Sequence, residues 1–403
     1  MKIIAGLDIG NGYVKGKIKI DDEKLMIVDL PSTVSYISGQ DLDRMPTSSY
    51  MTDFVNKLDA TFISQGIKAK DEGRILLGKR AIYSGGSQVE FNIDNHMPKS
   101  QDSLSTMLIL GTLSGAVIEH IYQKNGDLFN EPIKLNVNLG IALPIEDYLN
   151  YKDQYKQTLL NTSHYVHVHN FDKPITVEIV FDDVQVLAEG AAGQYAITNL
   201  GAEFLQMALN IARERGLMID DAYTGEMLAK AKNTIGVDIG EGTVNFPVFQ
   251  NGEIAIEVSS SINKGYGTVL SNVVAQLRNT PFAFESRKDL ADFLIKDDLM
   301  PNQIKLKEKV MVYVEKEINI FVRDIIKEYS NIFRKVGIRT DVIYVYGGGA
   351  NSVEKQLYTP LNEASVLDNN MSVPIIYLDS RYSRDLNRNG LFEAARLSTM
   401  VGK

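Results

Sequence analysis

Residues 3–18 read Ile-Ile-Ala-Gly-Leu-Asp8-Ile-Gly10-Asn11-Gly12-Tyr13-Val-Lys15-Gly-Lys-Ile. Two apolar runs flank a turn with two glycines, which is typical of a β-hairpin. Backbone N–H groups in such a turn can approach an anion closely, an aspartate beside them can hold a hydrated cation, and a lysine can neutralise a phosphate. A single Asp-x-Gly-x-Gly-x-x-Lys is also compatible with an ordinary turn, so the rest of the chain must decide.

The same pattern returns 230 residues further along the chain. Residues 234–249 read Thr-Ile-Gly-Val-Asp238-Ile-Gly240-Glu241-Gly242-Thr243-Val-Asn-Phe-Pro-Val-Phe. Both segments consist of an apolar entry, Asp-Ile-Gly-x-Gly and an apolar exit. An internal repeat explains this match better than two unrelated turns do. The repeat predicts that each hairpin begins a domain.

Length and composition narrow the classes of protein that remain. A chain of 403 residues with 44% apolar residues suggests two or more domains with real cores. The absence of Cys excludes disulfides and thiolate metal sites, and it fits a reducing cytoplasm. The net charge of −9, without a long basic block, disfavours direct binding of nucleic acid, although an acidic protein can act on DNA through an adaptor.

No segment is expected to enter a membrane. Asp8 interrupts the apolar stretch near the N-terminus, so this stretch does not read as a secretion signal. The longest uncharged apolar run, Ser105–Ile118, is shorter than the roughly 20 residues that span a bilayer. It predicts a buried helix, within a helix at residues 101–122.

Several segments allow more than one interpretation. Gly73–Arg80 is close to a P-loop, but Arg80 replaces the Ser or Thr that would bind Mg²⁺, and a strand is favoured. His164, His167 and His169 could suggest a metal site, yet no third ligand completes it, and solvent-facing strand residues are favoured.

Other elements follow from periodicity. The apolar stripe of residues 303–336 fits a coiled coil or a helix packed on a domain, and the strand that follows favours the second. Residues 184–216 predict a strand that becomes one long helix, and residues 255–259 predict a further strand. Residues 38–72 are left unassigned.

Three further features could complete a phosphate site. Lys264-Gly265 opens a helix, and a strand at 341–346 runs into Gly347-Gly348-Gly349-Ala350-Asn351 before another helix. A glycine turn between strand and helix offers N–H groups to an anion, although it can also be just a tight turn. Glu189 stands among small residues that allow close packing or a ligand nearby.

In this order, the motifs resemble those of the actin-like ATPase superfamily, which includes actin, rod-shape proteins, heat-shock ATPase chaperones and sugar kinases. The resemblance implies an α/β, ribonuclease H-like fold with two similar domains and a nucleotide in the cleft between them. It places domain I at residues 1–200, with a C-terminal helix at 384–403 returning to it, and domain II at 201–383. The chain most resembles the plasmid-segregating bacterial actins of the ParM type, through residues 7–15, 186–190 and 345–351.

The resemblance also implies roles for individual residues. Asp8 and Asp238 would hold Mg²⁺ largely through water, Lys15 would contact the phosphates, and Glu189 would orient or deprotonate the attacking water. Asn11 stands where actin has Ser. The residues expected to bind the nucleotide, ATP or GTP, are Gly10, Asn11, Gly12, Tyr13, Lys15, Gly240, Glu241, Gly242, Thr243, Gly265, Gly347, Gly348, Gly349 and Asn351.

The function implied is a filament-forming NTPase whose hydrolysis is stimulated by polymerisation. Such filaments move plasmid DNA through an adaptor protein on centromere-like DNA, so the expected partners are other copies of the chain and that adaptor, with no membrane and no direct nucleic acid contact. A small-molecule kinase of the same superfamily is the alternative. A chaperone-like ATPase lacks its peptide-binding domain here, and a degenerate pseudo-ATPase is disfavoured because Asp8, Lys15, Glu189 and Asp238 are all present.

Overall fold

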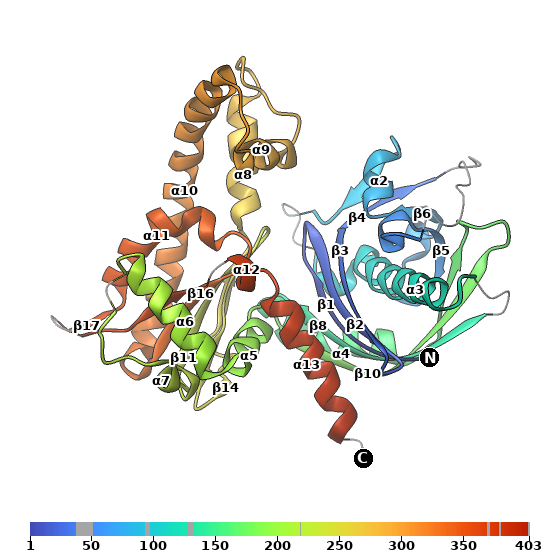
Figure 1. Ribbon diagram of the computed structural model, residues 1–403, viewed down its shortest axis with the longest axis horizontal. Helices are drawn as coiled ribbons and strands as arrows, with labels where there is room; N and C mark the ends of the chain where they lie inside the picture. The colour runs from blue at the N-terminus through green and yellow to red at the C-terminus, as the bar shows by residue number, and fades with distance from the viewer. Residues whose placement is uncertain are drawn as a thin grey trace. The chain divides into compact units, whose positions relative to one another are not determined.

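A computed structural model describes residues 1–37, 51–92, 97–127, 132–217, 219–368, 371–378 and 380–401 (Figure 1). Contacts divide the chain into two compact units. Unit 1 comprises Met1–Ala196 and Asp385–Lys403, and unit 2 comprises Ile197–Arg384.

Unit 1 is built on a ten-stranded mixed sheet with the strand order β3-β2-β1-β8-β10-β9-β5-β6-β4-β7. The β1–β2 hairpin is antiparallel, whereas β1 pairs with β8, and β8 with β10, in parallel. The expected hairpin that opens a mixed sheet is therefore confirmed. The strands are β1 (Lys2–Ile9), β2 (Tyr13–Ile20), β3 (Lys24–Pro31), β4 (Thr33–Tyr36), β5 (Asp59–Ile63), β6 (Arg74–Leu77), β7 (Gln88–Glu90), β8 (Ile133–Leu143), β9 (His164–Val168) and β10 (Ile175–Ala188).

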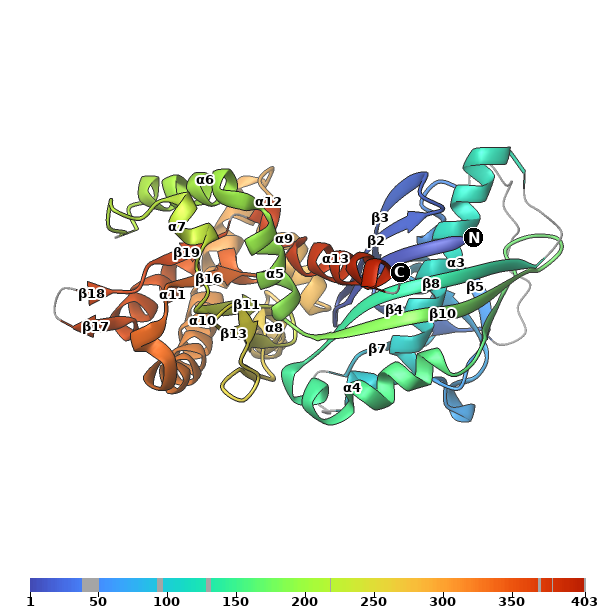
Figure 2. The ribbon, with the colours of Figure 1, turned by 90° about the horizontal axis from the view of Figure 1, so that it is seen from below.

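Five α-helices belong to the described part of unit 1, wholly or in part: α2 (Lys79–Tyr83), α3 (Ser103–Asn125), α4 (Ile145–Leu160), α5 (Ala191–Asn199) and α13 (Leu386–Val401). The Asp102 side chain caps α3 by accepting from the Leu104 N–H, and Gly126 ends it in the left-handed conformation. Among the described residues, α3 alone is long and apolar enough to cross a membrane, but 94% of its apolar window is buried in the protein. The prediction of a buried helix here is confirmed. Figure 2 shows α4 running alongside β10, on which it packs.

Three glycines let α13 lie directly on its neighbours. A Cβ on Gly6 of β1 or on Gly140 of β8 would overlap the backbone of α13, and a Cβ on Gly390 would overlap the carbonyl group of Ala192. The C-terminal helix therefore fits against β1, β8 and α5 only because these positions lack side chains.

Unit 2 contains a seven-stranded sheet. Its strands are β11 (Thr234–Ile239), β12 (Val244–Phe246), β13 (Val248–Gln250), β14 (Glu253–Ile254), β15 (Ser260–Ile262), β16 (Val342–Tyr346) and β19 (Ile375–Tyr377). The β11–β12 hairpin is antiparallel, and β11, β16 and β19 run parallel. The helices are α6 (Gly201–Glu214), α7 (Gly225–Ala229), α8 (Tyr266–Leu277), α9 (Arg287–Ile295), α10 (Pro301–Val336), α11 (Ala350–Ala364) and α12 (Ser380–Ser383), and β17 (Val366–Asp368) pairs with β18 (Met371–Ser372).

The long helix α10 is a domain helix, as the sequence favours, and packs on α8 and α11 (Figure 1). Every member of the predicted apolar stripe is buried: Val310, Val314, Ile318, Phe321, Ile325, Tyr329, Ile332 and Val336. The stripe therefore reflects the core of unit 2.

Two sequence-based expectations are wrong. Residues 184–216 do not form a strand and one long helix, because β10 begins at Ile175 and two helices follow it, separated near Gly201 with φ of 81°. Residues 255–259 do not form a strand. Ser259 instead closes a turn, in which its backbone N–H and hydroxyl both donate to the Ala255 carbonyl, and β15 begins one residue later.

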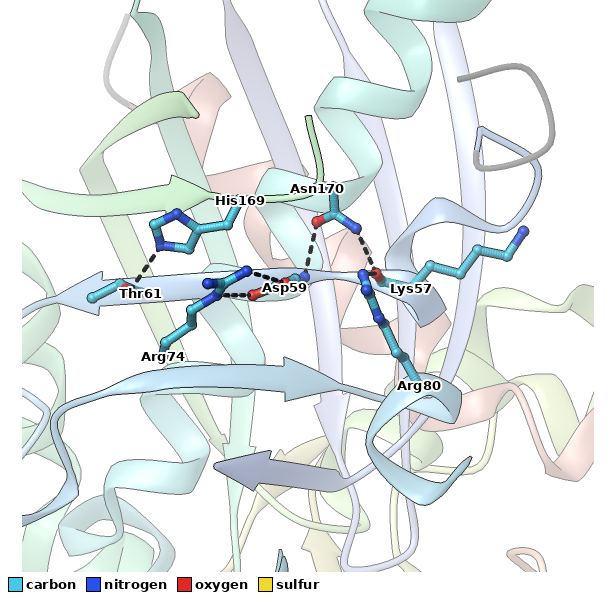
Figure 3. A network of polar contacts seen from close by, with 7 residues as sticks. All are labelled: Lys57, Asp59, Thr61, Arg74, Arg80, His169 and Asn170. Atoms are coloured by element: carbon cyan, nitrogen blue, oxygen red, sulfur yellow. Dashed lines mark hydrogen bonds and ion pairs between the residues drawn. The ribbon is translucent and has the colours of Figure 1, made fainter. Parts of the chain in front are cut away.

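The histidines of β9 and its end are structural. His164 is fully buried, so its expected solvent-facing position is wrong; Nε2 donates to a main-chain carbonyl, and Nδ1 therefore accepts from the Ser64 hydroxyl. His167 and His169 share the half-buried face, and His169 bonds Thr61 across 2.9 Å (Figure 3). Among the described residues, no group of three His, Cys, Asp or Glu side chains is placed to hold a metal ion.

A polar network joins β5, β6 and the chain after β9 (Figure 3). Arg74 holds the buried Asp59 carboxylate through two bonds of 2.8 and 2.9 Å. Asn170 accepts from the Asp59 N–H and donates to the Lys57 carbonyl, which also accepts from Arg80. The P-loop-like segment therefore supplies a strand, as expected, and arginines for structural bonds.

Candidate functional site

The first glycine turn joins β1 and β2 at the carboxyl end of β1. The strand register places Asp8 directly opposite Lys15. The Gly10 N–H donates to the Tyr13 carbonyl across 3.1 Å, and a Cβ on Gly10 would lie only 2.7 Å from that carbonyl oxygen. A side chain at this position would therefore open the turn.

Ser32, between β3 and β4, holds this turn from outside. Its hydroxyl donates to the Gly10 carbonyl across 2.6 Å, and its backbone N–H donates to the Gly12 carbonyl across 3.0 Å. Asn11 lies between these two anchored residues and is partly exposed. The turn is thus fixed at both glycines, while its middle faces outward. The sequence offered no sign of Ser32, because a lone serine after a strand has no distinctive pattern.

The second glycine turn, in unit 2, has the same geometry. The Gly240 N–H donates to the Thr243 carbonyl across 2.9 Å, and the register places Asp238 opposite Asn245. Asp238 is almost fully buried. The predicted repeat is therefore a repeat of structure, with one difference: Asn245 stands where the first turn has Lys15. The cationic side chain belongs to the first turn alone.

The start of α8 lies against the second turn. The Tyr266 N–H donates to the Gly240 carbonyl across 3.0 Å, and the Gly267 N–H donates to the Glu241 carbonyl across 2.8 Å. A Cβ on Gly265 would overlap the Glu241 main chain. Gly265 is therefore required for the close approach of helix and turn, and the structure places it beside the second turn.

The glycine turn before α11 lies on the other side of Asp238. Gly347 has φ of 97°, and a Cβ there would overlap the Asp238 carboxylate. The Gly349 N–H donates to the Ile239 carbonyl across 2.8 Å. A Cβ on Gly348 would have no atom within 4 Å, so the turn presents open backbone at its centre. Asn351, in the first turn of α11, is exposed.

Glu189 occupies the carboxyl end of β10 in unit 1 and is 8% exposed. Its N–H donates to the Leu143 carbonyl at the end of β8 across 2.7 Å, and Gly190 then turns the chain at φ of 80°. The Glu189 carboxylate accepts a 2.6 Å bond from Lys99, a residue that the sequence did not single out. Ligands of parallel α/β sheets bind at this edge.

Two family models match the chain. One, described as the N-terminal domain of actin-like proteins, matches residues 6–191, and the other, described as the C-terminal part of the archaeal actin homologue MreB-like, matches residues 236–359. The chain belongs to the actin-like superfamily. No curated protein sequence matches it.

Solved structures share the fold of this actin-like protein across its length. The apo psk41 ParM protein has a TM-score of 0.54 and 18% identity, covering 100% of this chain and 99% of its own. Bacillus thuringiensis ParM with ADP has a TM-score of 0.58 and 14% identity, with 99% of both chains covered. An archaeal actin homolog has a TM-score of 0.60 and 14% identity, covering 98% of this chain and 99% of its own. The two-domain actin-like fold expected from the sequence is confirmed.

Four charged groups act on Asp8 in this actin-like protein. Burial raises the pKa of Asp8; among the charges, Lys15, Lys99 and Arg388 lower it and Glu189 raises it. Two carboxylates and three cations therefore lie close enough to influence one another at one edge of the unit 1 sheet. This arrangement fits a site that binds a charged ligand.

The acidic residues also fit the magnesium that the resemblance implies. Mg²⁺ is usually held by one or two carboxylates, substrate phosphates and several waters, so a dense cluster of protein ligands is not required. Asp8 in unit 1 and Asp238 in unit 2 each stand beside a glycine turn. Burial raises the pKa of Asp8 and so disfavours its charged form, a cost that a divalent cation would reduce.

Two arginines form ion pairs with acidic residues, one in each unit. Arg388, on α13 and 5% exposed, pairs with Asp385 at 2.7 Å and with Asp29 at 3.4 Å. In unit 2, Arg287 pairs with Glu241 at 3.2 Å. Sequence spacing could not reveal these contacts, apart from Asp385–Arg388 within one helical turn, because the partners lie far apart in the chain.

Proposed function

We propose that this chain is a nucleotide-dependent, filament-forming actin-like NTPase that segregates plasmid DNA through a DNA-bound adaptor protein. The observation that carries the proposal is the pair of Asp-Ile-Gly-x-Gly turns. Each closes with the same hydrogen bond, Gly10 to Tyr13 in unit 1 and Gly240 to Thr243 in unit 2. Ordinary hairpins have no reason to repeat both the aspartate and the turn.

In this proposal, both turns bind the phosphates of one nucleoside triphosphate, ATP or GTP. Their backbone N–H groups and Lys15 bind the phosphate oxygens. Asp8 and Asp238 would hold Mg²⁺ largely through water, and the ion would supply charge neutralisation for the triphosphate. Open backbone at Gly348, before α11, offers a surface for the base and ribose.

Glu189 is the proposed group that orients and deprotonates the attacking water. It lies at the same sheet edge as the first turn and influences Asp8 electrostatically. The water's oxygen attacks the terminal phosphorus in line, a proton passes to the Glu189 carboxylate, and the bond to the leaving diphosphate oxygen breaks.

Filament formation is supported by the likeness to ParM proteins, of which the Bacillus thuringiensis protein has been solved with ADP, ATP and AMPPNP. Head-to-tail addition uses two different surfaces of each copy and does not close into a ring. Completion of the site on assembly couples hydrolysis to polymerisation. The net charge of −9 agrees with contact to DNA through an adaptor, and the absence of Cys fits a reducing cytoplasm.

Phosphate release and sedimentation, measured together with ATP and with GTP, test this proposal. We expect the wild type to sediment and to release phosphate with at least one of them, and Asp8→Asn to lose both properties. Asp221→Asn, at a fully exposed position, is the control. Hydrolysis that requires a small-molecule acceptor, in a protein that never sediments, would indicate a kinase instead.

A further inference from the structure

Lys99 contacts residues at or shortly after the carboxyl ends of β1, β8 and β10, the three parallel strands of unit 1. It is only 8% exposed. Its ammonium group donates to the Ile9 carbonyl at the end of β1 across 3.0 Å, and to Glu189 after β10 across 2.6 Å. Its backbone N–H donates to the Asp147 carboxylate, after β8, across 2.9 Å.

The ion pair between Lys99 and Glu189 is buried, unlike a typical surface ion pair. Both side chains are 10% exposed, and the Lys99 ammonium also lies 5.9 Å from the centre of the Phe91 ring. Removing two charges from water costs several kcal/mol, so a buried pair is weak grounds for a role in stability. The contacts instead connect Glu189 to Ile9, the residue immediately before the first glycine turn.

We propose that Lys99 is a positioning residue for nucleotide hydrolysis, which fixes the Glu189 carboxylate against the first glycine turn. This inference rests on the proposed function. By bonding Oε1, Lys99 limits rotation of the carboxylate, and by bonding the Ile9 carbonyl it ties that orientation to the turn that binds phosphate. Its charge also lowers the pKa of Asp8, against the larger effect of burial.

The chain offers a matched control for the pair. Lys124 and Glu23 are also 2.6 Å apart, but their side chains are 54% and 53% exposed. Lys124→Met removes an ammonium group from an ion pair of the same length as Lys99–Glu189, without changing the sheet edge that carries Glu189. Exposed pairs of this kind contribute about 0–1 kcal/mol.

The test is steady-state kinetics of Lys99→Met, Lys99→Arg, Glu189→Gln, the Lys99→Met/Glu189→Gln double variant and Lys124→Met. We expect Lys99→Met to lower kcat by about 10- to 100-fold, as the loss of supporting contacts commonly does, with little change in KM. Lys99→Arg should fall between wild type and Lys99→Met. In the Glu189→Gln background, Lys99→Met should cause no further loss, because the group that it positions is already disabled.

Three results would overturn the inference while leaving the proposed function intact: wild-type kcat in Lys99→Met, a raised KM with unchanged kcat, or the same fold loss in the Glu189→Gln background. The second would make Lys99 a phosphate contact. Should Lys99→Met not fold, the Lys99→Met/Glu189→Gln double variant decides, because it leaves no unpaired buried charge. A kcat below that of Glu189→Gln alone would then contradict positioning. A wild type without hydrolysis refutes the proposed function and this inference together.

Discussion

Gly347 lies against the Asp238 carboxylate so closely that a Cβ at this glycine would overlap Oδ1. Its φ of 97° is in addition a conformation that L-residues rarely adopt. The glycine turn before α11 is therefore fitted to the second Asp-Ile-Gly-x-Gly turn, and the two form one surface in unit 2.

Replacement of Gly347 by Ala should strain the backbone and displace Asp238. We expect a loss of about 1–3 kcal/mol in the free energy of unfolding, and weaker nucleotide binding. Gly348→Ala is the control for stability, because its Cβ would meet no atom within 4 Å. Urea unfolding and fluorescent-nucleotide titration measure the two effects. Equal stability of both variants would contradict the fit described above.

Lys15 should matter for phosphate binding and Lys17 should not. A hydrogen bond to a charged group contributes about 1.5–3 kcal/mol, so Lys15→Met should raise the Kd for the triphosphate by about 10-fold or more. Lys17, on the same strand, donates to Asn389 and lies 4.8 Å from the centre of the Phe392 ring. Calorimetric titration should show an unchanged Kd in Lys17→Met. The same Kd in Lys15→Met would remove Lys15 from the phosphate site.

Glu189→Gln should bind nucleotide but turn it over slowly. The amide keeps an oxygen that can accept from Lys99 but is a poor proton acceptor, so hydrolysis should fall by about 10²- to 10⁴-fold. Glu189→Ala should behave alike, and filaments of either variant should persist after wild-type filaments have disassembled. Single-turnover phosphate release measures the rate. Wild-type hydrolysis in both variants would show that another group activates the water.

Acid should destabilise unit 1 through His164. Burial lowers the pKa of His164. Below about pH 6.5, His164 therefore binds a proton in the unfolded chain before it does so in the folded chain. The contribution of neutral His164 to the free energy of unfolding is present above that pH and is lost as the pH falls toward the lowered pKa. The free energy then changes by at most about 1.4 kcal/mol per pH unit.

Thermal unfolding of wild type and His164→Gln between pH 5 and 8 measures this slope. The wild type should lose stability more steeply on acidification than the variant. Burial also lowers the pKa of His120 and His169, so the variant should retain part of the slope. Identical slopes in both proteins would show that His164 does not contribute.

The sequence predicts the parts of the site that are encoded locally. A β-hairpin with Asp8, Gly10 and Lys15 forms from neighbouring residues, and its repeat at Asp238 was visible because the same local chemistry recurs. The Gly347 turn was predicted for the same reason, since strand, glycines and helix follow one another directly.

Contacts between distant segments could not be predicted in this way. Lys99 lies 90 residues from both Ile9 and Glu189, and only the order of strands in the sheet brings the three together. His164 is a different case, because Val166 and Val168 share its face of β9, and their alternation already indicates which face is buried. Gly201 resembles many tolerated helical glycines, and only its positive φ shows that the chain breaks between α5 and α6 at this position.

Electron microscopy of the purified protein with Mg²⁺, with and without ATP and GTP, tests the central claim most directly. We predict filaments with at least one of the triphosphates and isolated particles without nucleotide. Isolated particles under every condition, at protein concentrations in the tens of micromolar, would contradict the proposal that this actin-like protein forms filaments.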